Sequence, residues 1–238
     1  LLEDELDLVD AYHAAGLRIV QLCYNRKNLV GDGAAERTDG GLSYFGVALI
    51  ERLNALGMIV DCAHTGHRTS MEAVEVSQAP VIISHANARA VYDSRRNIED
   101  DLIRAVATSG GVVGTVGFPS FLTAKGQPSL DQFIDDMAYK ADLVGIDHVG
   151  IGIDYYLGQH GVESDADARV RYDRMIADGH WREAEYPAPP YMYPKGIETP
   201  QTLRNLTARL LERGFAEDDV RKILGLNWMR VYGEVWGG

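Results

Sequence analysis

Five short apolar runs rich in β-branched residues recur along this 238-residue chain, and helical patterns separate them. Such runs predict buried β-strands, and apolar residues at three- and four-residue spacing predict helices. The predicted strands are residues 17–23, 58–64, 81–85, 111–117 and 149–154, and the predicted helices between them are residues 46–56, 69–77, 98–108 and 130–144. Because each helix returns the chain to the same end of the sheet, we expect the strands to be parallel.

This alternation of strand and helix fits an α/β fold of the (β/α)8 TIM-barrel type, in which eight parallel strands close on themselves. About five βα units are present, and residues 3–15 form a predicted helix with no strand before it. We therefore expect three strands of such a barrel to lie outside this chain.

We expect one barrel domain over residues 1–238, since the chain is 46% apolar and long enough to bury a large core. Residues 155–198, rich in Asp, Tyr and Pro, are predicted to form a long loop over the active-site rim. Residues 200–236 hold two amphipathic helical patterns, 201–213 and 218–235, which suit the outside of the barrel.

The net charge of −12 comes from 35 acidic and 23 basic residues spread along the chain, which argues against nucleic acid or an anionic membrane as a partner. No window approaches the roughly 18 to 20 apolar residues that a membrane span needs. Cys23 and Cys62 lie inside apolar runs without paired spacing, so we expect buried free thiols and a reducing compartment, the cytoplasm. This expectation does not cover a targeting segment upstream of Leu1.

Four polar residues end a predicted strand or follow it directly: Tyr24, His64, His85 and Asp154. The carboxyl ends of parallel strands meet at one rim, which carries the active site in (β/α)8 barrels. The sequence therefore predicts that these four side chains face a common site.

His64 and His85 are 21 residues apart, about one βα unit, so they should project from neighbouring strand ends. Two neutral imidazoles at adjacent strand ends suit zinc, although a catalytic zinc normally has a third protein ligand. Either histidine alone would fit a hydrogen-bonded rim residue equally well. The pair at matched positions favours a metal site.

Asp154 at the rim is suited to binding metal, holding a substrate amine, moving a proton to a leaving amine, or capping a helix or loop. Arg96 precedes a predicted helix, where its planar guanidinium suits a substrate carboxylate, but the sequence alone favours a surface ion pair for it. Gly150-x-Gly152 lacks the third glycine of a dinucleotide fingerprint, and no Ser or Cys stands in a nucleophile-elbow context. Nicotinamide binding and covalent catalysis are therefore disfavoured.

Four motifs accompany these residues: Asp61-Cys62-Ala63-His64, Pro80-Val81-Ile82-Ile83-Ser84-His85, Ser94-Arg95-Arg96-Asn97 and Gly150-Ile151-Gly152-Ile153-Asp154. In order and spacing they resemble the membrane (renal) dipeptidases, a family of zinc metallopeptidases. The resemblance runs from about Leu1 to Trp236. Two further stretches, Tyr24-Asn25-Arg26-Lys27-Asn28 and Gly41-Leu42-Ser43, are more similar to the bacterial branch of that family than to the mammalian one.

The resemblance implies a (β/α)8 barrel that holds two zinc ions, bridged by a carboxylate and by a water or hydroxide that attacks the dipeptide carbonyl. It implies that His64 and His85 bind one zinc and that Arg96 receives the substrate's C-terminal carboxylate. Asp154 would meet the amino end and help to protonate the leaving amine. Tyr24 stands where some relatives carry a His that steadies the oxyanion, and a phenol can supply one such hydrogen bond. The expected partner is a small dipeptide substrate. A homodimer is the oligomeric state that we consider.

The family also carries an H-x-D pair on its first strand and a bridging Glu on its third. This chain has no counterpart, because His13-Ala14-Ala15 is not H-x-D and Glu3 and Glu5 lie on the opening helix. We expect that N-terminal third, with the Glu just before Leu1, in a longer parent protein. The prediction is thus a zinc-dependent dipeptidase that uses metal-activated water. The alternatives are a related amidohydrolase acting on another amide, such as a β-lactam, and a non-catalytic barrel that has lost the first metal site.

Overall fold

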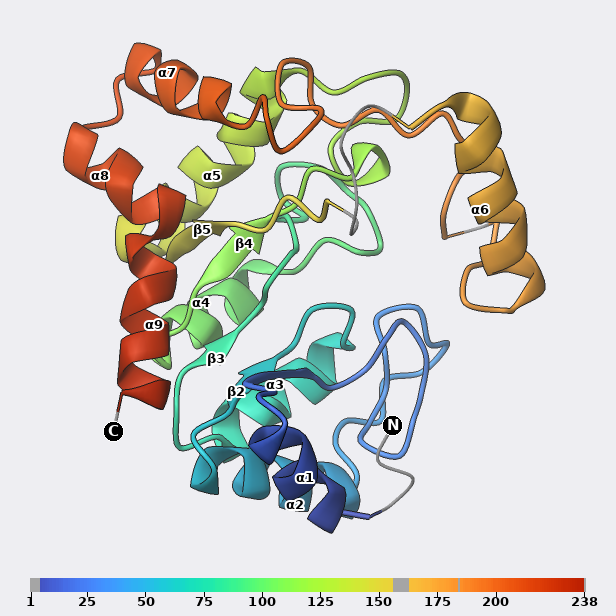
Figure 1. Cartoon of the computed structure of the whole chain (residues 1–238), viewed down its shortest axis with the longest axis vertical. Helices are drawn as coiled ribbons and strands as arrows, with labels where there is room; N and C mark the ends of the chain where they lie inside the picture. The colour runs from blue at the N-terminus through green and yellow to red at the C-terminus, as the bar shows by residue number, and fades with distance from the viewer. Residues whose placement is uncertain (1–4, 156–162, 184, 238) are drawn as a thin grey trace.

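The computed structural model of the chain describes residues 5–155, 163–183 and 185–237. Five short parallel strands lie side by side in the order of the sequence (Figure 1). They are β1 (Ile19–Gln21), β2 (Ile59–Asp61), β3 (Val81–Ile82), β4 (Val113–Thr115) and β5 (Val149–Ile151). A parallel bridge between Ile83 and Val113 joins the first three strands to the last two. Each strand lies within a predicted run, so the prediction of parallel strands in an α/β fold is confirmed for these residues.

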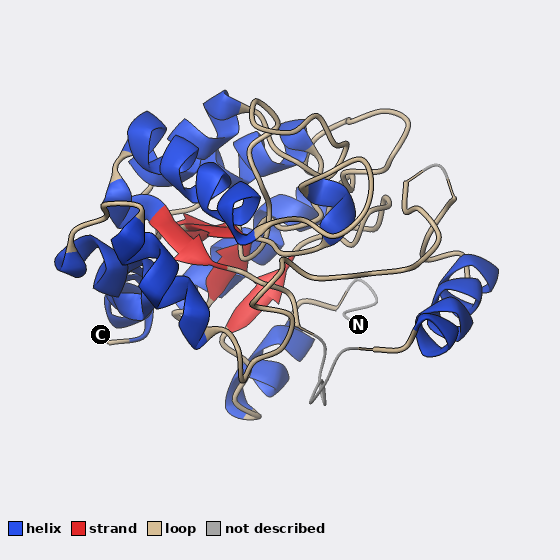
Figure 2. Ribbon diagram, turned by 90° about the horizontal axis from the view of Figure 1, so that it is seen from above, coloured by secondary structure: helices blue, strands red, loops and turns tan. Residues whose placement is uncertain are grey.

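Helices occupy the connections and gather along one side of the strands, whereas the loops on the other side carry α6 (Asp165–Ala177) (Figure 2). The connecting helices are α2 (Tyr44–Ala55), α3 (His67–Val76), α4 (Asp100–Thr108) and α5 (Leu130–Val144), and α1 (Asp7–Ala14) precedes β1. Local signals start two of them. The Ser43 hydroxyl accepts a hydrogen bond from Gly46 N at 3.0 Å, and Ser129 forms a capping box with Gln132.

The end of the chain forms α7 (Arg204–Glu212), α8 (Glu217–Arg221) and α9 (Asn227–Trp236), with a π-helical turn, η3 (Lys222–Leu226), between the last two. A single helix over residues 218–235 was the wrong prediction, because Gly225 leaves the helical region of φ and ψ inside this turn. Asn227 holds the start of α9 next to β5, because its Nδ2 donates hydrogen bonds to Ile146 O at 2.7 Å and to Val149 O at 2.8 Å.

Residues 155–198 are not a continuous loop, because they contain α6. The Ser164 hydroxyl caps this helix by accepting a hydrogen bond from Asp167 N at 3.2 Å. Ala168 and Tyr172 are its buried residues. Because α6 buries only these two side chains, its sequence shows little apolar periodicity, and a loop was predicted in its place. We call residues 163–183 and 185–193 the α6 segment.

Cys23 and Cys62 are free and buried, as predicted. Burial raises the pKa of the Cys23 thiol to about 12, so this thiol stays protonated at neutral pH. Across the part of the chain that the structure describes, no helix has both the length and the apolar character needed to cross a bilayer.

A buried ion pair ties α5 to the loop after β3. Lys140 Nζ lies 2.7 Å from Asp136 Oδ2 with both side chains fully buried, and it donates to Ala86 O at 3.0 Å. The Asp136 carboxylate also accepts from Ala88 N at 2.6 Å and from Thr115 Oγ1 at 2.8 Å. A buried pair of this kind is held only if its remaining donors and acceptors are satisfied, and here they bridge α5, β4 and the β3 loop.

Replacing Lys140 by Met should lower the free energy of unfolding by about 3–5 kcal/mol, because it leaves the Asp136 carboxylate buried without its cation. Urea denaturation of the full-length protein measures the change. Arg174→Gln is the control, since Arg174 is exposed on α6 and pairs only at the surface with Asp178. Equal stability of the Lys140→Met protein and the control would contradict this role of the ion pair.

Candidate active site

A cavity of about 330 Å³ is lined by residues that follow the five strands, and four of them carry the predicted site. Tyr24 follows β1, His64 follows β2, His85 follows β3 and Asp154 follows β5. Arg96, the fifth residue singled out in the sequence, lines a neighbouring cavity of about 370 Å³. His64 belongs to the walls of both cavities, so the two adjoin at this imidazole.

Sharp backbone turns place these side chains. Among the described residues, three non-glycine residues have a positive φ: Asn25 at 61°, His64 at 61° and Asp154 at 66°. This region is unfavourable for residues with a Cβ and is often retained at functional sites. The turns after β1 and β2 also contact each other, because Asn25 N donates to His64 O at 3.3 Å. Strands β1, β2 and β5 therefore end earlier than the apolar runs suggested.

Hydrogen bonds from the end of β2 hold His85. Ser84 Oγ lies 2.6 Å from Asp61 Oδ2 and 2.8 Å from His85 Nδ1. Asp61 Oδ1 accepts from the backbone N–H groups of Ala63 and Ser84, each at 2.9 Å. A hydroxyl has one proton, and Ser84 donates it to Asp61, so Ser84 Oγ accepts a hydrogen bond from His85 Nδ1. The lone pair of the His85 imidazole is therefore on Nε2.

His64 has the same tautomer. Its Nδ1 lies 2.7 Å from Oδ1 of Asn25, and an amide oxygen can only accept, so Nδ1 carries the proton. The His64 ring stacks on Tyr24 with 4.3 Å between centroids and meets His85 edge-on at 4.8 Å. Two imidazoles with free Nε2 lone pairs thus stand side by side.

Both imidazoles are neutral. Burial lowers the pKa of His64 well below 6.5 and that of His85 to about 3, and the positive charge of Arg96 lowers both further. Neutral imidazoles whose Nδ1 is held by a hydrogen bond are the usual form of histidine metal ligands. Within the described ranges, no group of three or more His, Cys, Asp or Glu side chains could hold a metal ion. His64 and His85 therefore suit zinc as two ligands and do not complete its site by themselves.

Arg96 is a buried cation with unused hydrogen-bond donors. Its side chain is 5% exposed, and its Nε and Nη2 find no hydrogen-bond partner among the described residues. Its guanidinium carbon lies 5.3 Å from the centroid of the Phe121 ring. The surface ion pair weighed for Arg96 is therefore wrong, because the guanidinium lies inside the protein. Unused fork-shaped donors suit a carboxylate.

The pKa of the Asp154 carboxyl lies above its ordinary value. Burial raises the pKa of this carboxyl to about 6, and the positive charges of Arg96 and Arg171 oppose the effect. The side chain is nevertheless open to the cavity, and its main-chain oxygen accepts a hydrogen bond from Tyr193 OH. Near neutral pH such a carboxyl can hold a cation when ionised and can donate a proton when protonated.

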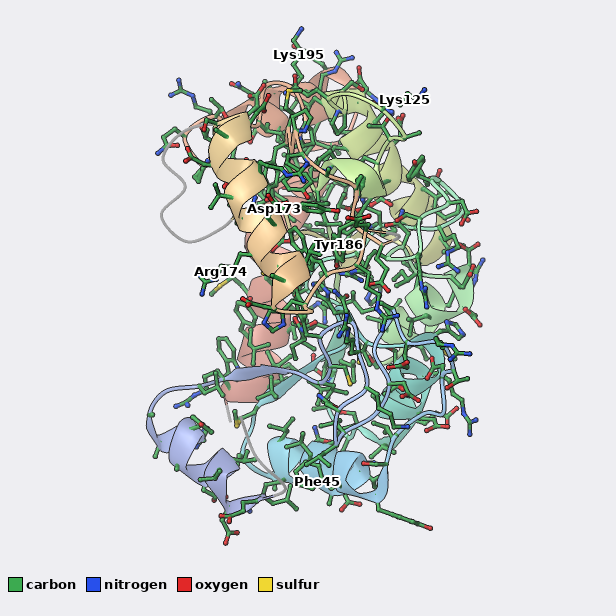
Figure 3. The ribbon with its side chains drawn as sticks, turned by 90° about the vertical axis from the view of Figure 1, so that its right-hand side faces the viewer. Phe45, Lys125, Asp173, Arg174, Tyr186 and Lys195 are labelled. Atoms are coloured by element: carbon green, nitrogen blue, oxygen red, sulfur yellow. The ribbon has the colours of Figure 1, made fainter. Side chains whose placement is uncertain are left out.

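The α6 segment contributes residues that the sequence did not single out. Trp181 Nε1 donates to Tyr24 OH at 3.1 Å, and the Trp181 ring stacks on Tyr186 with 4.6 Å between centroids. Tyr186 lies beside α6 (Figure 3), and Tyr172 of that helix donates to Tyr186 O at 3.3 Å. The available signal was the density of Tyr and Trp in the segment, which indicates a buried aromatic cluster but not its contact with the site.

A parallel α/β chain with two neutral imidazoles and an ionisable carboxyl at its strand ends has the features of a metallohydrolase. The chain belongs to the membrane dipeptidase family, peptidase family M19, whose model matches residues 1–185 and 189–236. The family resemblance of the four motifs is thereby confirmed.

Known proteins agree with this membership. The dipeptidase aclJ of Aspergillus oryzae is 31% identical over 94% of this chain and 46% of its own length, and an uncharacterized dipeptidase of Schizosaccharomyces pombe is 29% identical over 97% of this chain and 49% of its own length. The chain thus spans about half the length of these relatives.

Solved structures share the fold. An amidohydrolase from Pseudomonas aeruginosa matches with a TM-score of 0.88 and 36% identity, over all of this chain and 70% of its own. A metallo peptidase from Rhodobacter sphaeroides, liganded with a phosphinate mimic of the dipeptide L-Ala-D-Ala, matches with a TM-score of 0.78 and 25% identity, over 98% of this chain and 60% of its own.

Asp154→Asn tests the raised pKa. The folded-state pKa of about 6 lies above the ordinary value of 3.8, so ionisation of Asp154 costs the folded state stability as the pH rises between these values. The thermal midpoint of the variant, relative to the natural protein, should rise between about pH 4 and about pH 6 and then stay constant. Thermal melts of the metal-free, full-length protein measure it.

Asp173→Asn, at an exposed position of α6 (Figure 3), is the control for loss of a carboxylate elsewhere. A stability difference between the Asp154→Asn and natural proteins that does not change with pH would contradict the raised pKa.

Proposed function

We propose that this chain is part of a zinc-dependent dipeptidase that hydrolyses the amide bond of a dipeptide with metal-activated water. One observation carries the proposal. Two neutral imidazoles with free Nε2 adjoin a buried guanidinium with unused donors and a carboxyl with a pKa of about 6. These groups match the three chemical features of a dipeptide in its reaction: a carbonyl to polarise, a C-terminal carboxylate, and an amine that needs a proton.

Each residue has a role in this proposal. His64 and His85 would hold one zinc ion, and Arg96 would receive the substrate carboxylate through two N–H groups. Asp154 holds the amino end when ionised and gives a proton to the leaving amine when protonated. Tyr24 OH already accepts from Trp181 Nε1, so its own proton is available to a developing oxyanion. When bound, zinc lowers the pKa of a water molecule and polarises the scissile carbonyl.

We also propose that the full-length protein is a closed (β/α)8 barrel. In the described sheet, β1 and β5 are the two free edges, and three further strands would join them. That part would carry the H-x-D pair and the bridging Glu that the family resemblance implies, and with them a second zinc ion. Residues 155–198 would then cover the active-site rim, and residues 200–236 would pack outside the barrel. A homodimer and a cytoplasmic location stay predictions from the sequence.

Two rival functions are tested by the same experiments. A related amidohydrolase would use the same groups on another amide, such as a β-lactam, and one structural relative is described as an amidohydrolase. A non-catalytic barrel would bind no second zinc and hydrolyse nothing. The full-length protein should be assayed with a panel of dipeptides and with a β-lactam, and its zinc content should be measured by elemental analysis. Hydrolysis of dipeptides supports the dipeptidase, hydrolysis of the β-lactam alone supports the other amidohydrolase, and no hydrolysis without a second zinc supports the non-catalytic barrel.

His85→Ala should reduce the zinc content of the full-length protein from about two ions per chain to about one and should lower kcat/KM for dipeptides at least about 100-fold, because it removes a ligand of one zinc. Metal analysis and a hydrolysis assay measure both. The matched control is His180→Ala, which removes an exposed histidine outside both cavities. A full-length protein that contains no zinc and hydrolyses no dipeptide would refute the proposed function.

Arg96→Lys should raise KM for a dipeptide by about 10- to 100-fold, because Lys keeps the charge but loses the fork that binds both carboxylate oxygens. The same substitution should change KM much less for the corresponding dipeptide amide, which has no terminal carboxylate. Steady-state kinetics on the two substrates measure the difference. An equal loss on both would show that Arg96 does not bind the carboxylate.

A further inference from the structure

Three segments far apart in the sequence meet at one hydrogen-bonded chain beside His64. Tyr186 OH of the α6 segment accepts from Asn25 Nδ2 at 2.9 Å, and Asn25 Oδ1 accepts from His64 Nδ1 at 2.7 Å. Asn25 follows β1 and His64 follows β2. We infer that Tyr186 is a positioning residue that acts through Asn25 to hold His64 in the tautomer that leaves Nε2 free for a metal. The inference rests on the proposed function only in that His64 binds zinc.

Asn25 is held rigidly in the middle of this chain. Its side chain is fully buried, its φ is 61°, and its main-chain oxygen accepts from Ala35 N at 2.8 Å. Gly33 packs so closely against it that a Cβ on Gly33 would lie 2.2 Å from the carbonyl carbon of Asn25. The remaining freedom of Asn25 is rotation of its amide about χ2, which exchanges the oxygen and nitrogen that face His64.

That rotation decides the state of His64. With Oδ1 towards the imidazole, Nδ1 is protonated and Nε2 has a lone pair. With Nδ2 towards it, Nδ1 must accept, the proton moves to Nε2, and that nitrogen cannot bind a metal. Tyr186 OH is the acceptor for Nδ2 on the other side of the amide. Without this hydroxyl, the buried Nδ2 loses its partner, and the amide is no longer held from the α6 segment in the orientation that faces Oδ1 to His64.

The aromatic cluster holds Tyr186 itself. Its side chain is 3% exposed, stacks on Trp181 with 4.6 Å between centroids, and meets Phe118 edge-on at 6.0 Å. The position of the α6 segment over the cavity is thereby linked to the orientation of His64, although this segment supplies no candidate metal ligand.

Tyr186→Phe in the full-length protein removes only the hydroxyl, which hydrogen-bonds to Asn25 and also to the side chain of Arg96. We expect the zinc held by His64 to bind about 3- to 10-fold more weakly in this variant and about 10- to 100-fold more weakly in Asn25→Ala, the range for lost partners of metal ligands. The double variant should be no weaker than Asn25→Ala, because Tyr186 acts through Asn25. Competition with a chromophoric chelator measures zinc affinity, and ¹⁵N NMR of the metal-free protein reports the His64 tautomer.

Tyr191→Phe is the matched control, because Tyr191 lies in the same aromatic cluster but donates its hydroxyl proton to Pro187 O at 2.7 Å, away from the site. Asn25→Asp is the conservative rescue, since a carboxylate accepts from both His64 Nδ1 and Tyr186 OH and should keep the tautomer and the zinc.

Three results would overturn the inference: equal zinc affinity of the Tyr186→Phe and Tyr191→Phe proteins, additive losses in the double variant, or an unchanged His64 tautomer in Asn25→Ala. None of these readouts uses a dipeptide. A protein that shows the expected zinc and tautomer changes but hydrolyses no dipeptide would support the positioning role while refuting the proposed function.

Discussion

Parallel pairing of β1 to β5 in chain order is the constraint on which the site depends. Because every strand runs in the same direction, each carboxyl end arrives at the same rim, and the register of β2 with β3 sets His64 beside His85. The buried Asp136–Lys140 pair then fixes the turn directly after His85 by binding Ala86 O and Ala88 N. The packing of α5 against the strands therefore helps to set the position of His85 beside His64 at the rim.

Charge at the rim is organised around Arg96. A buried guanidinium with unused donors is costly unless an anion meets it. Burial is the main reason that the pKa values of His64 and His85 are lowered, and the charge of Arg96 lowers them further. The same charge holds the pKa of Asp154 below the value that burial alone would produce. This combination favours ligands that bring a carboxylate and a metal ion together, which is what the dipeptidase proposal requires.

Much of this arrangement could be predicted from the sequence. Apolar runs followed directly by a polar residue identify the strands and the rim, because buried parallel strands are continuously apolar and their ends are not. Spacing of one βα unit placed His64 and His85 side by side. The motifs around Arg96 and Asp154 indicated membership of the membrane dipeptidase family, and the match to the family model confirms it.

Other features depend on contacts that no local pattern encodes. The helix α6 has only two buried residues, so it lacks the periodicity that reveals amphipathic helices. Asn25 and Tyr186 are 161 residues apart, and their hydrogen bond exists only because the α6 segment folds back over the rim. Burial of Arg96 likewise follows from packing against Phe121 and not from its neighbours in sequence, which favoured a surface ion pair.

The most direct test of the account is the position of the metal in a crystal structure of the zinc-loaded, full-length protein, located by anomalous scattering at the zinc edge. The account predicts a zinc ion about 2.0–2.1 Å from Nε2 of both His64 and His85, with each Nδ1 still bonded to Asn25 and Ser84. Zinc bound elsewhere, or bound through Nδ1 of either histidine, would contradict it.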